Sequence, residues 1–249
     1  MSSSEGRPGT VPPAATSQKG CVILMGVSSW LVLGGEDPEY ALAGAAGQSG
    51  LVSQLRPLIV ELSNPGDLVF DPFAGWGTTL VACAAEGRLG VGLEINESRA
   101  EEARRRLEPY PGQRMLCGDA RKPPLDPGSA DLVLCDLPYF GTDLDVDAAG
   151  TGQMYALRDY DDYLSALDET FAAIADVMRP GAYAVIAVQN RRVAGSFVPL
   201  AWDASRVLGR HLTLGDERIH LYERPAGGDD PMLSNRSHEY LLMAVKPTA

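Results

Sequence analysis

Apolar and polar residues follow a regular order along the chain from residue 51 onward. Short apolar runs, which are typical of buried strands, alternate with longer runs that place apolar residues at helical intervals. Gly, Pro and Asn stand between many of the runs, as expected for turns. The predicted strands cover residues 67–71, 89–95, 114–119, 130–136, 182–190, 212–222 and 238–246. The predicted helices cover residues 51–63, 76–87, 96–107, 159–178 and 197–209.

The alternation of strands with helices favours one class of fold. Right-handed crossovers between successive strands give a mainly parallel sheet that is covered by helices on both faces. The long helix at 159–178 is expected to stop at Pro180 and Gly181. Two strand-like runs follow the last helix and indicate an antiparallel pair at one edge of the sheet. The sequence therefore predicts an α/β fold built on one main sheet.

Composition divides the chain into three parts. Residues 1–19 are rich in Ser, Gly, Pro and Thr and are expected to be disordered. Residues 20–47 include an apolar run at 21–35, which is shorter than the roughly 20 residues that cross a bilayer. A long polar leader precedes this run and acids follow it, unlike a signal peptide. We expect 20–47 to be an N-terminal capping element packed on a single domain at 48–249, with no membrane association.

Charge and cysteine content narrow the class of protein. The 21 basic and 33 acidic residues give a formal net charge of −12. This lowers the expectation of nucleic-acid binding, because contacts from Lys and Arg to phosphates supply most non-specific affinity. The cysteines are widely spaced and form neither a CxxC pair nor a Cys/His cluster, which predicts reduced thiols, a cytoplasmic location and no metal site. They are Cys21, Cys83, Cys117 and Cys135.

A glycine-containing turn, DPFAGWGTT at 71–79, follows the first strand of the main domain. In an open parallel sheet, ligands bind beyond the carboxyl ends of the strands. Gly75 and Gly77 allow the backbone to approach a ligand closely, and the next helix presents its N-terminus. The turn is not GxGxxG, so a dinucleotide is disfavoured, and no GK[ST] follows, which excludes a phosphate-binding loop of that type.

Acidic residues stand at the ends of successive strands. Glu94 ends the second strand, where a carboxylate can accept hydrogen bonds from both ribose hydroxyls of an adenosine-bearing ligand. Asp119 ends the third strand and can accept from an adenine amino group. A single acid at a strand end is more often a helix cap or a loop residue. With Asp71, however, three acids stand in register, and this favours a nucleoside-containing ligand.

DPFAGWGTT resembles the DPF-x-G-x-G-T-T turn of S-adenosylmethionine-dependent methyltransferases, specifically the DNA amino-methyltransferase group. The preceding LVSQLRPLIVELSNPGDLVF is similar to the helix that leads into this turn, and Trp76 stands where Ser is commoner. The resemblance implies a Rossmann-like class I methyltransferase fold, with a mainly parallel seven-stranded sheet and an antiparallel last strand. It implies S-adenosyl-L-methionine as the cofactor. The cofactor-binding residues it implies are Asp71, Phe73, Gly75, Gly77, Thr78, Glu94 and Asp119.

A second turn, DLPYF at 136–140, stands where this family has [D/N/S]-P-P-[Y/F/W]. An exocyclic amine is conjugated into its base and is a poor nucleophile, so the site must draw its lone pair out of conjugation. The resemblance implies that the Asp136 carboxylate and the Leu137 carbonyl accept the two N–H groups, while Pro138 stiffens the turn and Tyr139 stacks on the base. Leu137 replaces the first proline, which leaves its carbonyl less rigidly placed.

The identity of the acceptor is the most open part of the sequence interpretation. The resemblance implies DNA, with methyl transfer to an amino group of adenine or cytosine. The acidic segment 140–169 and the lack of a large recognition insertion favour instead a small nitrogen- or indole-containing metabolite. RNA, and a non-catalytic regulator that only binds the cofactor, remain further alternatives. The stretch 234–246 resembles an R-x-H-E-Y motif of DNA amino-methyltransferases. Basic residues that could gather into a rim are Arg191, Arg192, Arg206, Arg210, Arg218, Arg224, Arg236 and His238.

Overall fold

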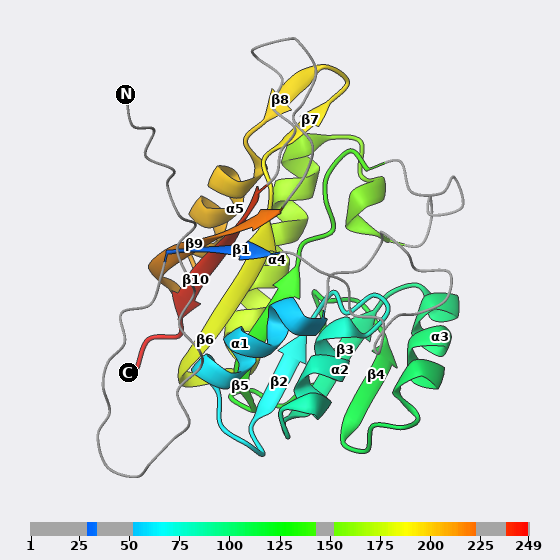
Figure 1. Cartoon of the computed structure of the whole chain (residues 1–249). Coiled ribbons are helices and arrows are strands. Elements are labelled where there is room, and N and C mark those ends of the chain that lie inside the picture. Colours follow the sequence, from blue (N-terminus) through cyan, green and yellow to red (C-terminus); the bar gives the residue numbers. More distant parts are fainter. Residues whose placement is uncertain (1–28, 34–51, 143–151, 223–237, 249) are drawn as a thin grey trace, which may run out of the picture.

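The computed structural model describes residues 29–33, 52–142, 152–222 and 238–248 (Figure 1). Its helices are α1 (Val52–Leu62), α2 (Thr78–Ala85), α3 (Glu97–Leu107), α4 (Tyr160–Val177) and α5 (Leu200–Leu208), with a short 3-10 helix at Met154–Ala156. Its main sheet contains β1 (Trp30–Leu33), β2 (Leu68–Asp71), β3 (Leu89–Glu94), β4 (Gln113–Cys117), β5 (Ala130–Asp136), β6 (Met178–Val188), β9 (Thr213–Tyr222) and β10 (His238–Val245). A separate hairpin pairs β7 (Arg191–Val193) with β8 (Ser196–Val198).

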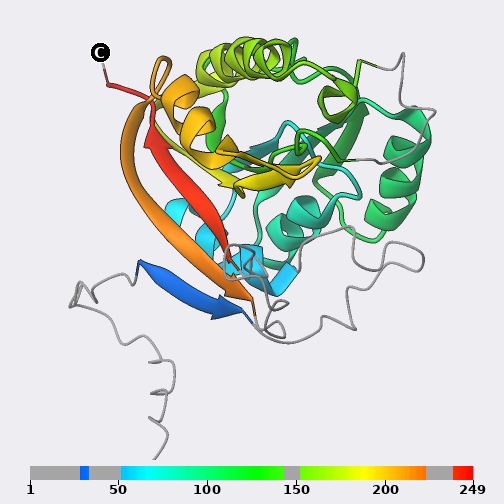
Figure 2. The same cartoon turned by 90° about the horizontal axis from the view of Figure 1, so that it is seen from above.

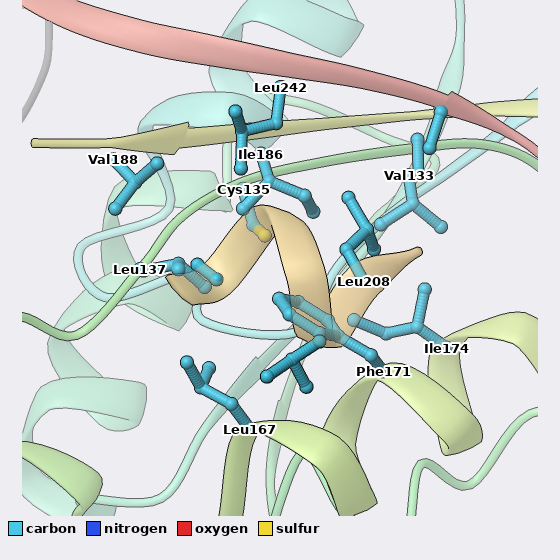
Figure 3. Close-up of a cluster of buried hydrophobic side chains, with 14 of the residues drawn as sticks. Val133, Cys135, Leu137, Leu167, Phe171, Ile174, Ile186, Val188, Leu208 and Leu242 are labelled. Carbon is cyan, nitrogen blue, oxygen red and sulfur yellow. The ribbon is translucent and has the colours of Figure 1, made fainter. Parts of the chain in front are cut away.

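Side chains of the central strands point alternately to the two faces of this sheet. On β5, Leu132 and Leu134 pack in one apolar cluster, while Val133 and Cys135 pack in another. Helices α1, α2 and α3 contribute to the first cluster, and α4 and α5 contribute to the second (Figure 2). Figure 3 shows the second cluster, in which Phe171 of α4 lies among side chains of the sheet. The helices therefore cover both faces, as the periodicity predicts.

The order of strands in the sheet is β1-β9-β10-β6-β5-β2-β3-β4. Neighbours from β4 to β6 are parallel, whereas β10 is antiparallel to both β6 and β9. The predicted seven-stranded, mainly parallel sheet with an antiparallel last strand is thus confirmed. In addition, β1 extends the sheet by pairing in parallel with β9. It belongs to the expected capping segment 20–47; the rest of that segment and the leader 1–19 lie outside the described residues.

Two predicted boundaries are wrong, and each has a local reason. The helix predicted at 159–178 spans Tyr160–Val177, but the strand predicted to begin at residue 182 begins already at Met178, so that Pro180 and Gly181 lie inside β6. The pairing of β5 with β6 shifts register between Ala130 and Leu132. The irregular stretch of β6 opposite this shift accommodates Pro180 and Gly181. Gly181 has φ +79° there, and its N–H donates to the carbonyl of Lys246.

The helix predicted at 197–209 begins only at Leu200. A residue before proline is disfavoured in the helical conformation, so Val198, which precedes Pro199, is extended. It pairs with Arg191 in the hairpin β7–β8. The two residues that close this hairpin, Ala194 and Gly195, have φ of +47° and +82°. Positive φ at both positions suits a tight hairpin turn.

Within the described ranges, no helix is both long and apolar enough to span a bilayer.

Gly92 on β3 lies under the turn that follows β2. A Cβ atom added at Gly92 would meet the Cβ of Ala74 at 2.5 Å and a methyl of Leu80 at 3.0 Å. We expect Gly92→Ala to lower the free energy of unfolding by about 1–3 kcal/mol, because the turn must move. Gly215→Ala is the control, since its nearest neighbour is a carbonyl oxygen at 3.8 Å. Urea unfolding measures both variants, and equal stability for the two would contradict this packing.

Candidate active site

Three acidic residues lie at the same edge of the sheet, because each ends one of three parallel neighbours. Asp136 ends β5, Asp71 ends β2 and Glu94 ends β3. Parallel neighbours place their carboxyl ends together, and these ends are where open α/β sheets bind ligands. The structure thus brings together the glycine turn and the DLPYF turn, which lie far apart in the sequence. Asp119 follows β4 by two residues and lies outside the strand.

The glycine turn is fastened to the neighbouring strand. The N–H of Ala74 donates to the carbonyl of Leu93 at 2.8 Å, and the N–H of Gly77 donates to the carbonyl of Ala74 at 2.7 Å. Gly75 and Gly77 have φ of +50° and +77°, the left-handed region that favours glycine. A Cβ at Gly77 would also contact Leu107 and Met115 at 3.4 and 3.5 Å. The turn therefore leads directly into α2, and Gly77 is packed against α3 and β4.

Asp71 holds this turn from within. Its side chain is buried, and its carboxylate accepts from the N–H of Phe73 at 3.0 Å. Burial raises the pKa of Asp71 to about 7, and the negative charge of Glu94 adds to this, while hydrogen bonds from Thr79 and Phe73 oppose it. The buried Thr78 is also held, since its hydroxyl accepts from Arg106 at 3.0 Å. Asp71 and Thr78 therefore hold the glycine turn in place through buried side chains.

Glu94 is buried at the end of β3, with 6% of its surface exposed. One carboxylate oxygen accepts from the N–H of Asn96 at 2.8 Å, and the other accepts from the Arg99 guanidinium at 3.3 Å. The same guanidinium lies 5.7 Å from the centre of the Trp76 ring. Arg99, which the sequence interpretation missed, thus links Trp76 of the glycine turn to Glu94.

Asp119 makes close contacts with Arg121. The carboxylate accepts from the Arg121 side chain at 2.6, 3.0 and 3.1 Å, and from its backbone N–H at 2.9 Å. These hydrogen bonds lower the pKa of Asp119 below its usual range. Asp119 also lines a shallow groove with Lys122 and with Glu169 of α4. Its carboxylate therefore stays ionised and fixed in orientation at the far end of the row of acids.

The DLPYF turn is anchored at each residue after Asp136. The N–H of Leu137 donates to the carbonyl of Ala187 at 3.1 Å. The hydroxyl of the buried Tyr163 donates to the carbonyl of Pro138 at 2.9 Å. The hydroxyl of Thr142 donates to the carbonyl of Tyr139, also at 2.9 Å. The ring of the next residue, Phe140, packs 5.0 and 5.5 Å from the rings of two tyrosines at the start of α4, Tyr160 and Tyr163.

Leu137 gives this turn a rigidity that the sequence did not reveal. Its side chain is 2% exposed and lies in the cluster formed with α4, near Leu167 (Figure 3). A proline at this position would lack the N–H that bonds to Ala187. Leu137 therefore lacks the stiff ring of a proline, but its buried side chain and its backbone hydrogen bond fix the turn instead.

Asp136 is an exposed residue, yet many protein atoms lie around its carboxyl group. Loss of hydration raises the pKa of Asp136 to about 8. The negative charges of Glu239 and Asp71 raise it further, while a hydrogen bond from Tyr139 and the charge of Arg191 lower it. At neutral pH the protonated form of this carboxyl therefore predominates, and the ionised form becomes the major one above about pH 8.

Glu239 reaches the site from β10, near the end of the chain. Its carboxylate lies 3.1 Å from a ring nitrogen of His220, a buried residue directly opposite it on β9. The pair places a further acid beside Asp136. Glu239 is the Glu of the R-x-H-E-Y resemblance, which was the one signal in the sequence that pointed to it.

The expected basic rim does not form as a single surface. Arg206 and Arg210 pair with acids of α5 and α4, at 3.0 and 3.3 Å. Arg218 pairs with Glu61 of α1, a helix that covers the opposite face of the sheet. Arg224 and Arg236 lie outside the described residues. Within the described part of the chain, no group of His, Cys, Asp or Glu is arranged to hold a metal ion.

Comparisons with known proteins find relatives of one segment of the chain. Residues 52–105 match the DNA methylase family. The DNA adenine methyltransferase YhdJ of Escherichia coli is 46% identical over 54 residues, and the type II methyltransferase M.Cfr9I of Citrobacter freundii is 44% identical over 54 residues. Each match covers 22% of this chain and 18% of the relative, so the chain spans about a fifth of the relatives it matches.

A solved structure extends the likeness to most of the chain. A TehB-like SAM-dependent methyltransferase from Corynebacterium glutamicum superposes with a TM-score of 0.52 at 17% identity, covering 81% of this chain and 91% of that one. The fold is therefore that of class I S-adenosylmethionine-dependent methyltransferases. The family match covers the glycine turn and Glu94, while the DLPYF turn lies beyond it.

We expect the buried side chain of Leu137 to hold the DLPYF turn. Leu137→Ala should lower the free energy of unfolding by about 2–5 kcal/mol, because it opens a cavity in the cluster with α4. Leu89→Ala is the matched control, since Leu89 is 48% exposed, and its effect should stay within about 0.5 kcal/mol. Denaturant unfolding of both variants provides the measurement. A similar loss in the two would show that Leu137 does not anchor the turn.

Proposed function

We propose that this member of the DNA methylase family transfers a methyl group from S-adenosylmethionine to an exocyclic amino group of adenine or cytosine in DNA. The observation that carries the proposal is the adjacency of two turns at one edge of the sheet. The glycine turn after β2 belongs to the segment that matches the family, and the DLPYF turn follows the neighbouring strand β5.

The first turn fits the cofactor by its chemistry. Gly75 leaves space beside the backbone for a ligand, since a Cβ atom there would come within 4 Å only of the Phe73 carbonyl oxygen, at 3.9 Å, and the next helix begins three residues later. Glu94 offers a buried carboxylate, which suits the two hydroxyls of a ribose. When bound, S-adenosylmethionine supplies an electrophilic methyl group. Asp71 would contribute to cofactor binding indirectly, because it holds the conformation of the glycine turn.

The second turn fits the acceptor amine. An ionised Asp136 accepts one N–H of the amine, and the Leu137 carbonyl, held by the anchored turn, accepts the other. Two acceptors in fixed positions draw the nitrogen lone pair out of the aromatic ring and aim it, which lowers the barrier to transfer. The new N–C bond leaves the nitrogen with one proton too many. Asp136, with its raised pKa, is placed to take that proton.

Two of the acids in segment 140–169, Asp159 and Asp168, have structural partners. Asp159 caps α4 and accepts from the N–H groups of Asp161 and Asp162 at 2.9 and 3.0 Å. Negative side chains in the first helical turn are favourable. Asp168 lies 2.9 Å from a ring nitrogen of His211. These two acids therefore have structural roles in α4 and are weaker support for a small-molecule acceptor than the sequence suggests.

The test of the proposal is transfer of radiolabelled methyl from S-adenosylmethionine to unmethylated genomic DNA, followed by nucleoside mass spectrometry. We expect N-methylated adenine or cytosine in the digest, and Asp136→Ala should abolish it while cofactor affinity changes by no more than a few-fold. Absence of labelled DNA, from protein that binds the cofactor, would refute DNA as the acceptor and leave the small metabolite. Wild-type turnover by Asp136→Ala would refute the assigned chemistry.

Glu94 should show the opposite behaviour. We expect Glu94→Ala to weaken binding of S-adenosylmethionine by about 1–3 kcal/mol, because hydrogen bonds to a buried carboxylate are lost. Glu61→Ala is a control, since Glu61 lies on α1 and pairs with Arg218. Isothermal titration calorimetry compares the variants. Equal affinities would remove Glu94 from the cofactor site.

The pH dependence of turnover should follow Asp136. Only the ionised carboxylate accepts from the amine, so kcat should rise with pH around an apparent pKa near 8. Glu239→Gln removes the main negative charge beside Asp136, so the pKa of Asp136 falls and the rise moves to lower pH. Glu217→Gln, an exposed change on β9, should not move it. Identical pH profiles for all three proteins would show that Asp136 does not control the rate.

A further inference from the structure

The hairpin β7–β8 lies against the DLPYF turn at the carboxyl edge of the sheet (Figures 1 and 2). A Cβ atom at Gly141, just after the turn, would meet both methyl groups of Val193 at 2.6 Å. Such close approach is possible only because residue 141 is a glycine, which also has φ +70°. The hairpin is therefore fixed to the catalytic turn as one wall of the same site.

The two faces of the hairpin differ in what they contact. Side chains alternate along a strand, so Arg191 and Val193 share the face toward the DLPYF turn. Arg192 lies on the opposite face with Phe197, its direct partner on β8. On the inner face, the Arg191 guanidinium lies 5.0 Å from the centre of the Tyr139 ring. This contact holds the guanidinium beside the residue that hydrogen-bonds Asp136.

Arg191 differs from most arginines of the described ranges in having no carboxylate partner. Nine arginines in the described ranges form ion pairs with carboxylates: Arg56, Arg99, Arg104, Arg105, Arg121, Arg179, Arg206, Arg210 and Arg218. Among the same residues, Arg191 forms no ion pair, and its Nε is buried without a hydrogen-bond partner. A buried donor without a partner is costly and calls for a ligand or another explanation.

We propose that Arg191 binds a phosphate of the acceptor, on the side of the site opposite the cofactor turn. This rests on the proposed function and makes it more specific: the acceptor enters as a nucleotide. A guanidinium presents a planar set of N–H donors that matches two phosphate oxygens at once. Its stacking on Tyr139 fixes that plane before the acceptor arrives. A neutral indole or amine metabolite would leave those donors unused.

The charge of Arg191 also acts on Asp136, and this provides the competing explanation. Asp136, Glu239 and Asp71 place negative charge around the site, and Arg191 offsets part of it. If that were its whole purpose, its removal would shift the pH dependence of turnover and leave the affinity for the acceptor unchanged. Binding of a phosphate predicts instead a change in the affinity for the acceptor at a pH where Asp136 is ionised.

The experiment measures kcat and KM at high pH for a short oligonucleotide that carries one mapped methylation site. Two further oligonucleotides replace the phosphate on the 5′ or the 3′ side of the target base by a neutral methylphosphonate. We expect Arg191→Ala to raise the KM for the normal oligonucleotide about 10- to 100-fold, the range for a lost charged hydrogen bond. One methylphosphonate should raise the KM of the wild type similarly and that of Arg191→Ala little.

Arg192→Ala, on the outer face of the same strand, is the matched control and should keep the wild-type KM and the wild-type penalty for the methylphosphonate. The inference is overturned if Arg191→Ala keeps the wild-type KM, if it changes only the pH profile, or if each methylphosphonate penalises it as it does the wild type. A wild type that methylates no DNA would refute the proposed function itself, before any variant is compared. If a nucleoside monophosphate serves as acceptor with the same dependence on Arg191, the phosphate recognised is that of a free nucleotide.

Discussion

The parallel pairing of β5, β2 and β3 is the constraint on which the site depends, because it brings Asp136, Asp71 and Glu94 to one edge. The same arrangement that assembles the site also places like charges together. Burial and mutual repulsion raise the pKa of Asp71 and of Asp136. The fold therefore creates both the ligand-binding edge and carboxyl groups that keep their protons up to about neutral pH.

Each functional turn is fixed by contacts from elements that are not part of it. The glycine turn is bonded to β3 through Leu93 and is packed against Gly92, which has no side chain to obstruct it. The DLPYF turn is bonded to β6 through Ala187 and to α4 through Tyr163. Because these partners are buried, the backbone groups that would face cofactor and acceptor are positioned before either binds.

The sequence was sufficient for the succession of strands and helices along the chain and for the two turns, because glycine, proline and strand-end acids mark them locally. It was not sufficient for contacts between distant segments. The link from Arg99 to Glu94 depends on side-chain reach, and the position of Glu239 depends on the pairing of β9 with β10. The hairpin β7–β8 was hidden because Ala194 and Gly195 resemble an ordinary loop, while Pro199 moved the helix start. The sequence also suggested that Leu137, in place of a proline, makes the DLPYF turn less rigid, whereas the buried Leu137 side chain holds the turn in place.

The position of β10 has a consequence for biosynthesis. This strand lies between β6 and β9, so β9 and β1 cannot join the rest of the sheet until residues 238–245 have been made. The segment from α1 to α3 contains its own strand pair and helices and is complete much earlier. During translation, the cofactor turn therefore has its neighbours in place well before Glu239 reaches Asp136. A nascent chain would be able to form the cofactor half of the site before the last strand has been inserted.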